Sequence, residues 1–223
     1  EPFDGLFTQG MVCHETYKDI KGKWVSPDEV EKDSKGSTVR KADKSKITVG
    51  PSEAMSKSKK NIVDPESMIK VYGADSVRWF ILSDSPPDKD IQWSDQGVNA
   101  SHKFLQKIWA LSYRILARKD KINVEDVRSQ IEGKFHKHLD KITNSIENFQ
   151  INVAVANIHE TYNLIDKNID NLVSNKFLKN ILTDFMKILF PFTPHMASEI
   201  LEKLGKTKID KWPEIKSDFM KNL

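Results

Sequence analysis

The hydrophobic pattern of the chain changes near residue 64 from short, irregular runs to a helical period. After residue 94, apolar side chains recur every three or four positions, at Val98, Phe104, Leu105, Ile108, Leu111, Ile115 and Leu116. This period predicts a helix from about 95 to 118, and similar periods predict helices at 124–148, 152–168, 174–189 and from Thr193-Pro194 to near Gly205. Because the connections are short, we expect an antiparallel helical bundle.

The first sixty residues contain short apolar runs that predict strands. Residues 6–12 form one such run, and residues 22–25 and 45–49 look like hairpin arms with polar links between them. Two short helices are predicted next. Asp64 can cap the first, which begins at Pro65 and ends at Gly73. The second, at 74–82, has an apolar side formed by Val77, Phe80 and Ile81. The fold class is therefore mainly α, with a small strand-rich part before the bundle.

Composition narrows the class of protein without identifying it. The chain has 223 residues, 38% of them hydrophobic, which is enough for one large or two modest domains, and we expect two. The single cysteine, Cys13, excludes an internal disulfide. No basic leader and no long apolar run occurs, so we expect a cytoplasmic protein. The net charge of +3 is too small to attract nucleic acid to the whole surface.

Candidate chemistry concentrates at residues 53–61, where two serines and three lysines follow one another without an apolar period. Hydroxyls and ammonium groups donate hydrogen bonds to phosphate oxygens, and flexible lysines can follow charge as it moves in a transition state. A solvated, lysine-rich turn is the common alternative. Between residues 40 and 60, only Asp43 and Glu53 oppose a local basic patch, which favours phosphate. The patch consists of Arg40, Lys41, Lys44, Lys46, Lys57, Lys59 and Lys60.

Several motifs resemble those of the class I aminoacyl-tRNA synthetases. The stretch MSKSKKN, at residues 55–61, is similar to the second signature of that class, usually written KMSKS. The stretches YGADSVR (72–78) and WSDQGV (93–98) also occur in the isoleucyl and valyl enzymes and indicate the subfamily. The stretches SDSPPDKDIQWSD (83–95) and PFDGLFTQGMVCHETY (2–17) resemble the leucyl branch of bacteria. The resemblance covers essentially the whole chain, including ILFPFTPHMASEIL near its end.

The resemblance implies a domain organisation. Residues 1–92 would be the end of a Rossmann-like catalytic domain with the KMSKS-type loop, and residues 93–223 an anticodon-binding-type helical bundle. The first signature of the class, of the HIGH type, is absent, and His14-Glu15-Thr16-Tyr17 does not replace it. We therefore expect a fragment without the first half of the catalytic domain, the editing insertion and the small C-terminal domain of leucyl enzymes.

The resemblance also implies a reaction. Leucine would react with ATP, with Mg²⁺ sharing the charge, to give leucyl-adenylate, and the leucyl group would then pass to leucine tRNA. Four residues would close over the ATP triphosphate: Met55, Ser56, Lys57 and Ser58. Lys57 would stabilise the departing pyrophosphate. Ala54 stands where the signature normally has its first lysine, so one cation is missing, and Lys59 or Lys60 could partly replace it.

Two interpretations of the whole chain stay open. It is either part of a leucyl-tRNA ligase, inactive by itself because the leucine pocket lies mostly elsewhere, or a non-catalytic tRNA-binding or interaction module derived from one. The missing first signature and Ala54 motivate the second interpretation, and we favour the first. In both cases tRNA would contact the bundle of a monomeric parent protein. The candidate cations, which a solvated helix face would explain equally well, are Lys103, Lys107, Arg114 and Arg118.

Other candidate sites are weak. Cys13 and His14 are adjacent and lack the partner cluster of a zinc site, so we predict no metal and an ordinary turn or strand role. His136 and His138 share a helix with three lysines, and a solvated surface is expected there. His195 follows a proline at a helix start, where capping or packing is expected.

Structural roles are expected for the remaining polar and aromatic positions. Asp75 and Arg78 have the spacing of an ion pair within one helix. Trp93-Ser94-Asp95 is expected to fix the junction to the bundle, and Ser94 or Asp95 to cap its first helix. Three aromatic residues are assigned to the core: Phe185, Phe190 and Phe192.

Overall fold

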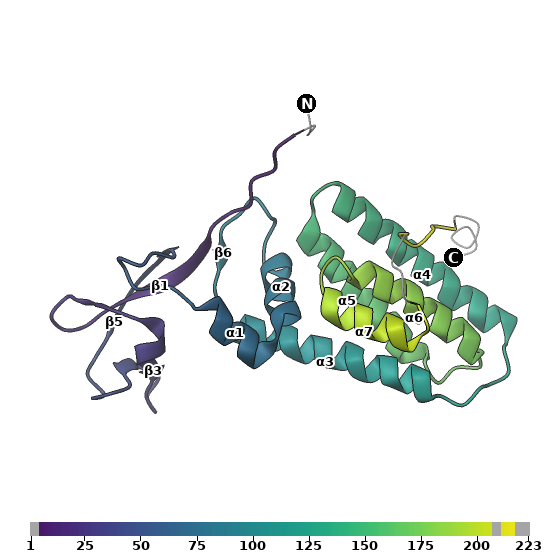
Figure 1. Cartoon of the computed structure of the whole chain (residues 1–223), viewed down its shortest axis with the longest axis horizontal. Helices are drawn as coiled ribbons and strands as arrows, with labels where there is room; N and C mark the ends of the chain where they lie inside the picture. The colour runs from purple at the N-terminus through teal and green to yellow at the C-terminus, as the bar shows by residue number, and fades with distance from the viewer. Residues whose placement is uncertain (1–4, 207–210, 217–223) are drawn as a thin grey trace. The chain divides into compact units, whose positions relative to one another are not determined.

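The computed structural model describes residues 5–206 and 211–216 (Figure 1). The chain divides into two compact units. One contains the residues up to 71 together with 87–97, and the other contains 72–86 together with the residues from 98 onward. The first is rich in strands and the second is helical, which confirms the predicted fold class. The domain boundary expected between residues 92 and 93 stays a prediction.

The strand-rich unit is organised around one central strand. Its elements are β1 (Val12–Lys18), β2 (Trp24–Val25), a short 3-10 helix (Pro27–Glu29), β3 (Val30–Lys32), β4 (Thr38–Arg40), β5 (Thr48–Ala54) and β6 (Ile91–Gln92). β1 pairs antiparallel with β2 and β5 and parallel with β6, whereas β3 and β4 form a separate antiparallel pair. The two expected hairpin arms correspond to β2 and the start of β5, and each pairs with β1.

The prediction of a strand at residues 6–12 is wrong except at its last residue, because β1 begins at Val12. Before that point the chain makes a close backbone crossing. The Gly10 N–H donates a hydrogen bond to the Pro87 carbonyl at 2.8 Å. A Cβ atom at Gly10 would lie 2.0 Å from the Lys89 carbonyl oxygen, so glycine is required here. The apolar run therefore leads into the sheet and does not form a strand of its own.

The helices begin and end within two residues of their predicted bounds. They are α1 (Pro65–Tyr72), α2 (Ala74–Ser83), α3 (Asp95–Ala117), α4 (Glu125–Glu147), α5 (Ile151–Asn168), α6 (Asn175–Leu189) and α7 (Pro194–Lys203). Gly73 separates α1 from α2 with a φ of 81°, which glycine adopts without strain. Ser94 caps α3 by accepting from the Gly97 N–H at 3.2 Å. In the described part of the chain, no helix is both long and apolar enough to cross a membrane.

The helical unit has a continuous hydrophobic core to which α2 contributes an unexpected face. The predicted apolar side of α2 is wrong for Val77 and Ile81, because the buried residues are Asp75, Ser76, Trp79 and Phe80. The Trp79 ring lies 5.3 Å from the Phe104 ring, centroid to centroid. The indole therefore fixes the rotation of α2 against the bundle. The aromatic residues assigned to the core are confirmed, with Phe185 and Phe192 buried and Phe190 packed against them.

Asp75 and Arg78 connect α2 to the start of α7. The predicted ion pair between these two residues is wrong. The Asp75 carboxylate accepts from the backbone N–H of His195 at 3.4 Å and of Met196 at 2.8 Å. Its Oδ1 also lies 2.8 Å from Nδ1 of His195. Arg78 donates to two backbone carbonyls just before α7, at 2.7 and 3.1 Å. Because the first N–H groups of a helix lack internal partners, the carboxylate acts as the cap of α7.

The histidines of α4 are less exposed than the sequence suggests. His136 is only 4% exposed, so the expected solvated surface is wrong at this position. Burial lowers the pKa of His136, and the nearby Lys216 ammonium lowers it further. His138 is half-buried, and burial lowers its pKa too. The three lysines that share the helix, Lys134, Lys137 and Lys141, do face solvent, so only the histidines of this group turn toward the core.

Candidate functional site

The candidate site is the signature loop, residues 55–61, which joins β5 to the approach of α1. Its first residue continues the sheet, since the Met55 N–H donates to the Val12 carbonyl at 3.2 Å. A turn follows, in which the Lys60 N–H donates to the Lys57 carbonyl at 3.3 Å. Lys60 has a φ of 54°, a left-handed conformation that reverses the chain. Asp64 then caps α1 by accepting from the Ser67 N–H at 3.0 Å, as predicted.

Asn61 fastens both ends of this loop, and sequence reasoning missed its role. Its side chain is fully buried, at 0% exposure. The amide nitrogen donates to the carbonyls of His14, Glu53 and Ala54 at 3.2, 3.1 and 3.4 Å. The amide oxygen accepts from the Ser56 N–H at 2.8 Å. One side chain therefore ties the loop to β1, to the end of β5 and to itself.

The loop presents its lysines unequally. Lys57 and Lys60 are exposed and, within the described part of the chain, form no ion pair. Lys59 instead forms an ion pair with Glu53 on β5. Of the two lysines considered as replacements for the missing cation, Lys60 is thus the one whose ammonium is not engaged by a carboxylate. Ser56 and Ser58 lie with their hydroxyl oxygens 2.8 Å apart, so both hydroxyls are on one side of the turn.

Ala54 ends β5, opposite Cys13 of β1, and its side chain is exposed. A longer side chain could therefore be placed here without entering the core. Cys13 itself is a buried strand residue, as expected. Burial raises the pKa of its thiol, with a further contribution from the nearby Asp90 carboxylate. Among the described residues, no group of three or more potential metal ligands occurs.

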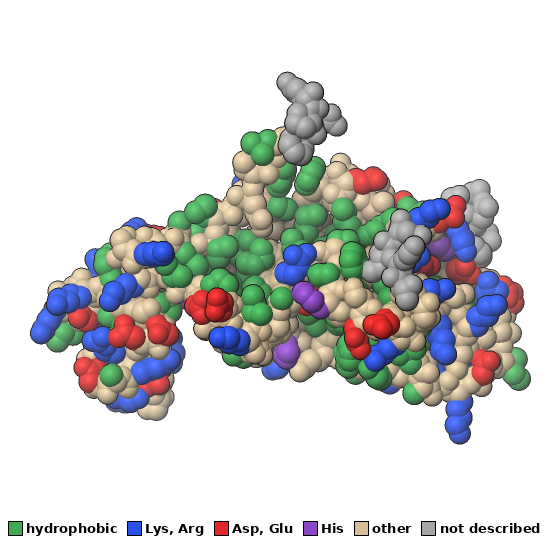
Figure 2. All heavy atoms as spheres, viewed as in Figure 1, with side chains coloured by type: hydrophobic (Ala, Val, Ile, Leu, Met, Phe, Trp, Pro, Cys, Tyr) green, Lys and Arg blue, Asp and Glu red, His purple; other side chains and the backbone are tan. Residues whose placement is uncertain are grey.

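The basic patch predicted from residues 40–60 is partly neutralised by acids from the preceding strand pair. Arg40 donates to the Glu29 carboxylate at 2.7 Å, and this contact lowers the pKa of Glu29. Lys44 forms an ion pair with Glu31. Both acids lie outside the sequence window in which the patch was counted. Acidic and basic side chains accordingly both appear on the visible face of the strand-rich unit (Figure 2).

A cavity of about 520 Å³ lies in the strand-rich unit but does not suit a triphosphate. Its lining includes three carboxylates, those of Asp28, Asp64 and Asp95, and a single cation, Lys41. Hydrogen bonds from Ser67, from its side chain first and then its backbone, lower the pKa of Asp64 and keep it ionised. None of the loop lysines lines this cavity.

The four cations proposed on α3 for tRNA contacts are not equally available. Arg118 donates to the carbonyls of Val173 and Asn171 and to the Asn175 side chain, which ties α3 to the start of α6. Arg114 pairs with Asp166 at 2.7 Å. The remaining two, Lys103 and Lys107, are exposed and, in the described residues, form no ion pair. Half of the proposed face is therefore used within the protein.

Comparison with known proteins decides the family. Residues 45–94 match the family model of class I tRNA synthetases (I, L, M and V), and residues 129–223 match that of the anticodon-binding domain of tRNA ligases. The leucine–tRNA ligase of Bartonella henselae is 42% identical over 96% of this chain, and that of Orientia tsutsugamushi is 39% identical over 99%. The chain belongs to the leucine–tRNA ligase family. It spans 26% of the length of each of these two leucine–tRNA ligases.

Solved structures agree with the leucine–tRNA ligase assignment at the level of the fold. A leucyl-tRNA synthetase of Agrobacterium radiobacter, determined as a ternary complex with tRNA and LeuAMS, matches 99% of this chain with a TM-score of 0.72 and 24% identity, over 25% of its own chain. A methionyl-tRNA synthetase of Mycobacterium tuberculosis in complex with methionyl-adenylate matches 68% of this chain with a TM-score of 0.60 and 19% identity, over 36% of its own chain. The resemblance predicted from the motifs is confirmed.

Proposed function

We propose that this chain supplies the ATP-contacting loop and the tRNA-docking bundle of a leucine–tRNA ligase. That enzyme would activate leucine with ATP to leucyl-adenylate and transfer the leucyl group to leucine tRNA, acting as a monomer in the cytoplasm. The supporting observation is the loop itself. A KMSKS-type sequence stands between a strand and a capped helix and is fastened by a buried amide. Lys57 in it is exposed and forms no ion pair with a carboxylate of the described residues.

The loop residues supply positioning and charge in this proposal. When the leucine carboxylate attacks the α-phosphate, the bond to pyrophosphate breaks and negative charge builds on the departing oxygens. Lys57 would place its ammonium on that charge, and the hydroxyls of Ser56 and Ser58 would donate hydrogen bonds to phosphate oxygens without needing deprotonation. Met55 would fix where the loop starts, since its N–H donates to the Val12 carbonyl and continues the sheet.

Magnesium would reach the reaction with the nucleotide. Glu53, which precedes the loop on β5, is engaged by Lys59, and Asp64, which follows it, caps α1. The loop therefore does not fit a protein-held magnesium site, and no step of the proposal is assigned to a metal bound by this chain. The phosphate oxygens of ATP are themselves the ligands that Mg²⁺ prefers.

The function is tested by leucine-dependent ATP–pyrophosphate exchange with a full-length protein that carries this segment. Exchange that depends on leucine and is not supported by isoleucine or methionine is the expected result. The 223-residue chain alone is expected to show none, because the HIGH-type signature is absent from it. Absence of exchange in the full-length protein would contradict the proposal.

The non-catalytic alternative rests on Ala54 and has its own test. If the loop serves catalysis, it does so with one cation fewer than the signature. Ala54→Lys in the full-length protein should then raise the rate of adenylate formation by restoring that cation. The exposed end of β5 can hold a lysine without strain. Glu53 remains paired with Lys59 in this variant, so the comparison isolates the added charge. A binding module would show tRNA affinity with no exchange in either form.

A further inference from the structure

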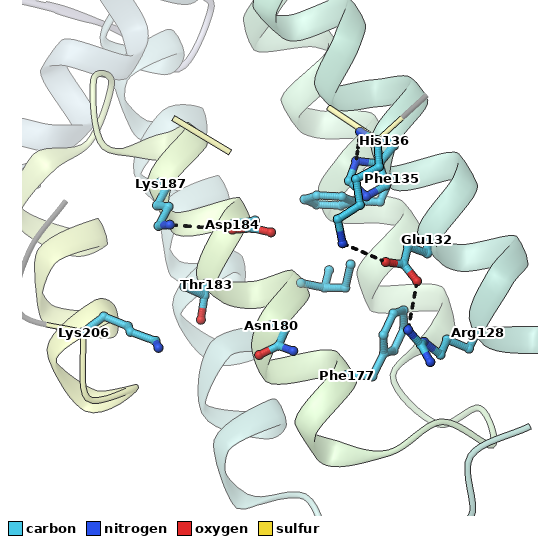
Figure 3. Close-up of a pocket in the computed structure, with 12 residues that line it drawn as sticks. Arg128, Glu132, Phe135, His136, Phe177, Asn180, Thr183, Asp184, Lys187 and Lys206 are labelled. Atoms are coloured by element: carbon cyan, nitrogen blue, oxygen red, sulfur yellow. Dashed lines mark hydrogen bonds and ion pairs between the residues drawn. The ribbon is translucent and has the colours of Figure 1, made fainter. Parts of the chain in front are cut away.

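Buried polar side chains outside the signature loop include a cluster that neutralises itself and a hydroxyl that contacts the loop-bearing strand. The cluster surrounds a cavity of about 510 Å³ between α4 and α6 (Figure 3). Its Glu132 carboxylate lies 3.5 Å from the Arg128 guanidinium and 3.6 Å from the Lys216 ammonium. The hydroxyl is that of Thr16 on β1, which is 1% exposed and contacts β5, the strand that leads into the loop. Thr16 is therefore coupled to the loop, whereas the cluster is self-contained.

The pairing of β1 with β5 changes register at Thr16. Glu15 lies opposite Ser52, and the next pair along β1 is Thr16 with Gly50. Pro51 is therefore an extra residue on β5 and forms a β-bulge. A bulge bends its strand and redirects the side chains beyond it, and bulges are common next to active sites. This one lies just before the signature loop, so it controls how β5 enters the loop.

Three residues suit this bulge. The Thr16 hydroxyl donates a hydrogen bond to the Pro51 carbonyl at 3.1 Å, which satisfies a buried donor and fixes the extra residue. Proline has no N–H, so Pro51 can occupy the extra position without leaving a backbone donor unpaired. A Cβ atom at Gly50 would lie 2.5 Å from Oγ1 of Thr16, so glycine leaves the room that the hydroxyl occupies. We call Thr16, Gly50 and Pro51 the β5 bulge.

The β5 bulge determines which face of the sheet the last residues of β5 occupy. Successive side chains of a strand point to opposite faces, and residues directly opposite each other share a face. Ala54 lies opposite Cys13. If the register before the bulge continued regularly, Ala54 would lie opposite Val12 and its side chain would be on the other face. The bulge thus orients position 54, where the signature has its first lysine.

The signature loop is held in this register by its own contacts to the sheet. The Asn61 amide donates to three carbonyls on the loop side of the bulge, those of His14, Glu53 and Ala54. The Met55 N–H donates to the Val12 carbonyl. A change of register at the end of β5 would alter all of these contacts together. The position of the loop, and with it that of Lys57, therefore depends on the bulge.

We propose that the β5 bulge orients the signature loop for the proposed reaction and that Thr16 is a positioning residue. Its buried hydroxyl acts through β5 and does not reach substrate. This inference rests on the proposed function and deepens it, because it adds a residue outside the motif to those that place the Lys57 ammonium. A small displacement of a group that stabilises a transition state lowers the rate by a large factor, so the effect of Thr16 is expected in turnover.

The first test is leucine-dependent ATP–pyrophosphate exchange with a full-length protein that carries this segment. Thr16→Val keeps the shape of the side chain and removes the donor, so turnover should fall by about tenfold or more while the apparent ATP constant changes by less than about twofold. Thr16→Ser keeps the donor and should recover most of the turnover. Gly50→Ala, whose added methyl group displaces the Thr16 hydroxyl, should reproduce the loss and replaces Thr16→Val if thermal melting shows that Thr16→Val is unfolded.

Thr48→Val is the matched control for Thr16→Val. It makes the same replacement at an exposed position of the same strand pair, opposite Lys18. Because it removes no contact of the bulge, turnover should stay within about twofold of the parent.

The second test is hydrogen exchange in the 223-residue chain, which needs no activity. The Met55 N–H is bonded to the Val12 carbonyl and the Ser56 N–H to the Asn61 side chain. Both amide hydrogens should exchange faster with solvent in Thr16→Val and at the original rate in Thr48→Val. If the full-length parent shows no leucine-dependent pyrophosphate exchange, the proposed function fails, and hydrogen exchange still tests the bulge.

Four results would overturn the assignment. Full turnover in Thr16→Val together with a lower melting temperature would make Thr16 a structural residue only. A loss confined to ATP affinity would contradict the role in turnover. Failure of Thr16→Ser to recover turnover would show that the hydroxyl is not the group that matters. Unchanged hydrogen exchange at Met55 and Ser56 would show that the loop does not depend on the bulge.

Discussion

Removal of the Asn61 side chain would leave three backbone carbonyls and the Ser56 N–H without their partner inside the fold. Each buried polar group that loses its partner costs about 1–3 kcal/mol. Among the described residues, Lys59 contacts the sheet through its ion pair with Glu53, and the Asn61 amide makes the further contacts that hold the loop. Asn61 is thus a positioning residue in the proposed reaction, while Lys57 is the candidate that touches substrate.

Asn61→Ala is expected to loosen the signature loop without unfolding the strand-rich unit. Trypsin cleaves after lysine, so cleavage at Lys57, Lys59 and Lys60 should become faster in the 223-residue chain. In the full-length protein, the turnover of adenylate formation should fall by about tenfold or more, because a misplaced cation loses transition-state stabilisation. Ser58→Ala, which removes only one hydroxyl contact, is the matched control for the proteolysis. Unchanged cleavage would show that the loop is held by other contacts.

Lys57→Ala should lower the rate of adenylate formation while leaving the loop as resistant to trypsin at its other lysines as before. A charge that acts mainly as pyrophosphate separates affects turnover more than ATP affinity, and the loss of one such donor typically costs about 2.7–4 kcal/mol of activation free energy. Exchange kinetics at varied ATP concentration separate the two effects. A rise in the apparent ATP constant with full turnover would instead make Lys60 the candidate cation.

At this scale the sequence reveals which residues are present but not which are paired. The motif directs attention to Lys57, and the structure shows that this side chain is exposed. It could not show that Lys59 is held by Glu53, or that Asn61 is the buried member of the stretch, because both facts depend on how β5 and β1 align. Likewise, the acids that neutralise Arg40 and Lys44 lie across a strand pair and not beside them in the chain.

Among the elements, α7 depends on a cap supplied by another helix. Thr193 precedes α7 in the usual position for a capping residue, yet its side chain accepts no hydrogen bond from the first turn. The Asp75 carboxylate, 120 residues earlier, accepts from the His195 N–H instead. Sequence rules for helix starts assume a local cap, which is why the helix boundary was predictable and the partner of Asp75 was not.

Asp75→Ala is expected to destabilise the helical unit by about 1–2 kcal/mol, the usual cost of losing an N-cap plus a dipole contact. The loss should appear as a lower midpoint in chemical denaturation of the 223-residue chain. Glu202→Ala, an exposed carboxylate at the other end of α7, is the matched control and should change the midpoint little. Asp75→Asn should recover part of the loss, since an amide oxygen can still accept from the two N–H groups. Equal effects of Asp75→Ala and Glu202→Ala would argue against the cap.

The stability of the whole molecule should depend on pH through three histidines of the helical unit. Burial lowers the pKa of each below the usual 6.5: His136, His138 and His159. The His159 ring is stacked on Phe104, with centroids 3.7 Å apart. The unfolded chain therefore binds more protons than the folded chain just below pH 6.5, and stability must fall as the pH decreases through that value. Above it, all three are neutral in both states and contribute no pH dependence.

Thermal melting should therefore show a decreasing midpoint as the pH is lowered below 6.5, by about 2–4 °C for each kcal/mol lost. The half-buried Asp184, whose pKa desolvation raises, opposes this trend only at lower pH, where it takes up a proton in the folded state. Replacing His138 and His159 by Gln should flatten the curve. A midpoint that stays constant down to pH 5, where the histidines would have to charge, would contradict the burial effect.

The general architecture was within reach of the sequence because helical periods and turn residues are local signals. Each bundle helix was predicted within two residues, and the strand-rich start was recognised as such. What local signals cannot contain is the rotation of each helix about its axis. The rotation of α2, set by Trp79 against Phe104, and the burial of His136 are both consequences of tertiary packing.

The tie between α2 and α7 has a practical consequence for dissecting the protein. A bundle shortened to end at Leu189 would keep five of its helices. It would remove the backbone partners of the Asp75 carboxylate, which is 9% exposed, and of the Arg78 guanidinium. An uncompensated buried charge costs roughly 3–5 kcal/mol, a large share of what holds a domain of this size together. Such a truncated protein is expected to aggregate on expression, whereas a chain that ends beyond α7 should fold by itself. Limited proteolysis should cut between α6 and α7 only after the whole bundle has unfolded.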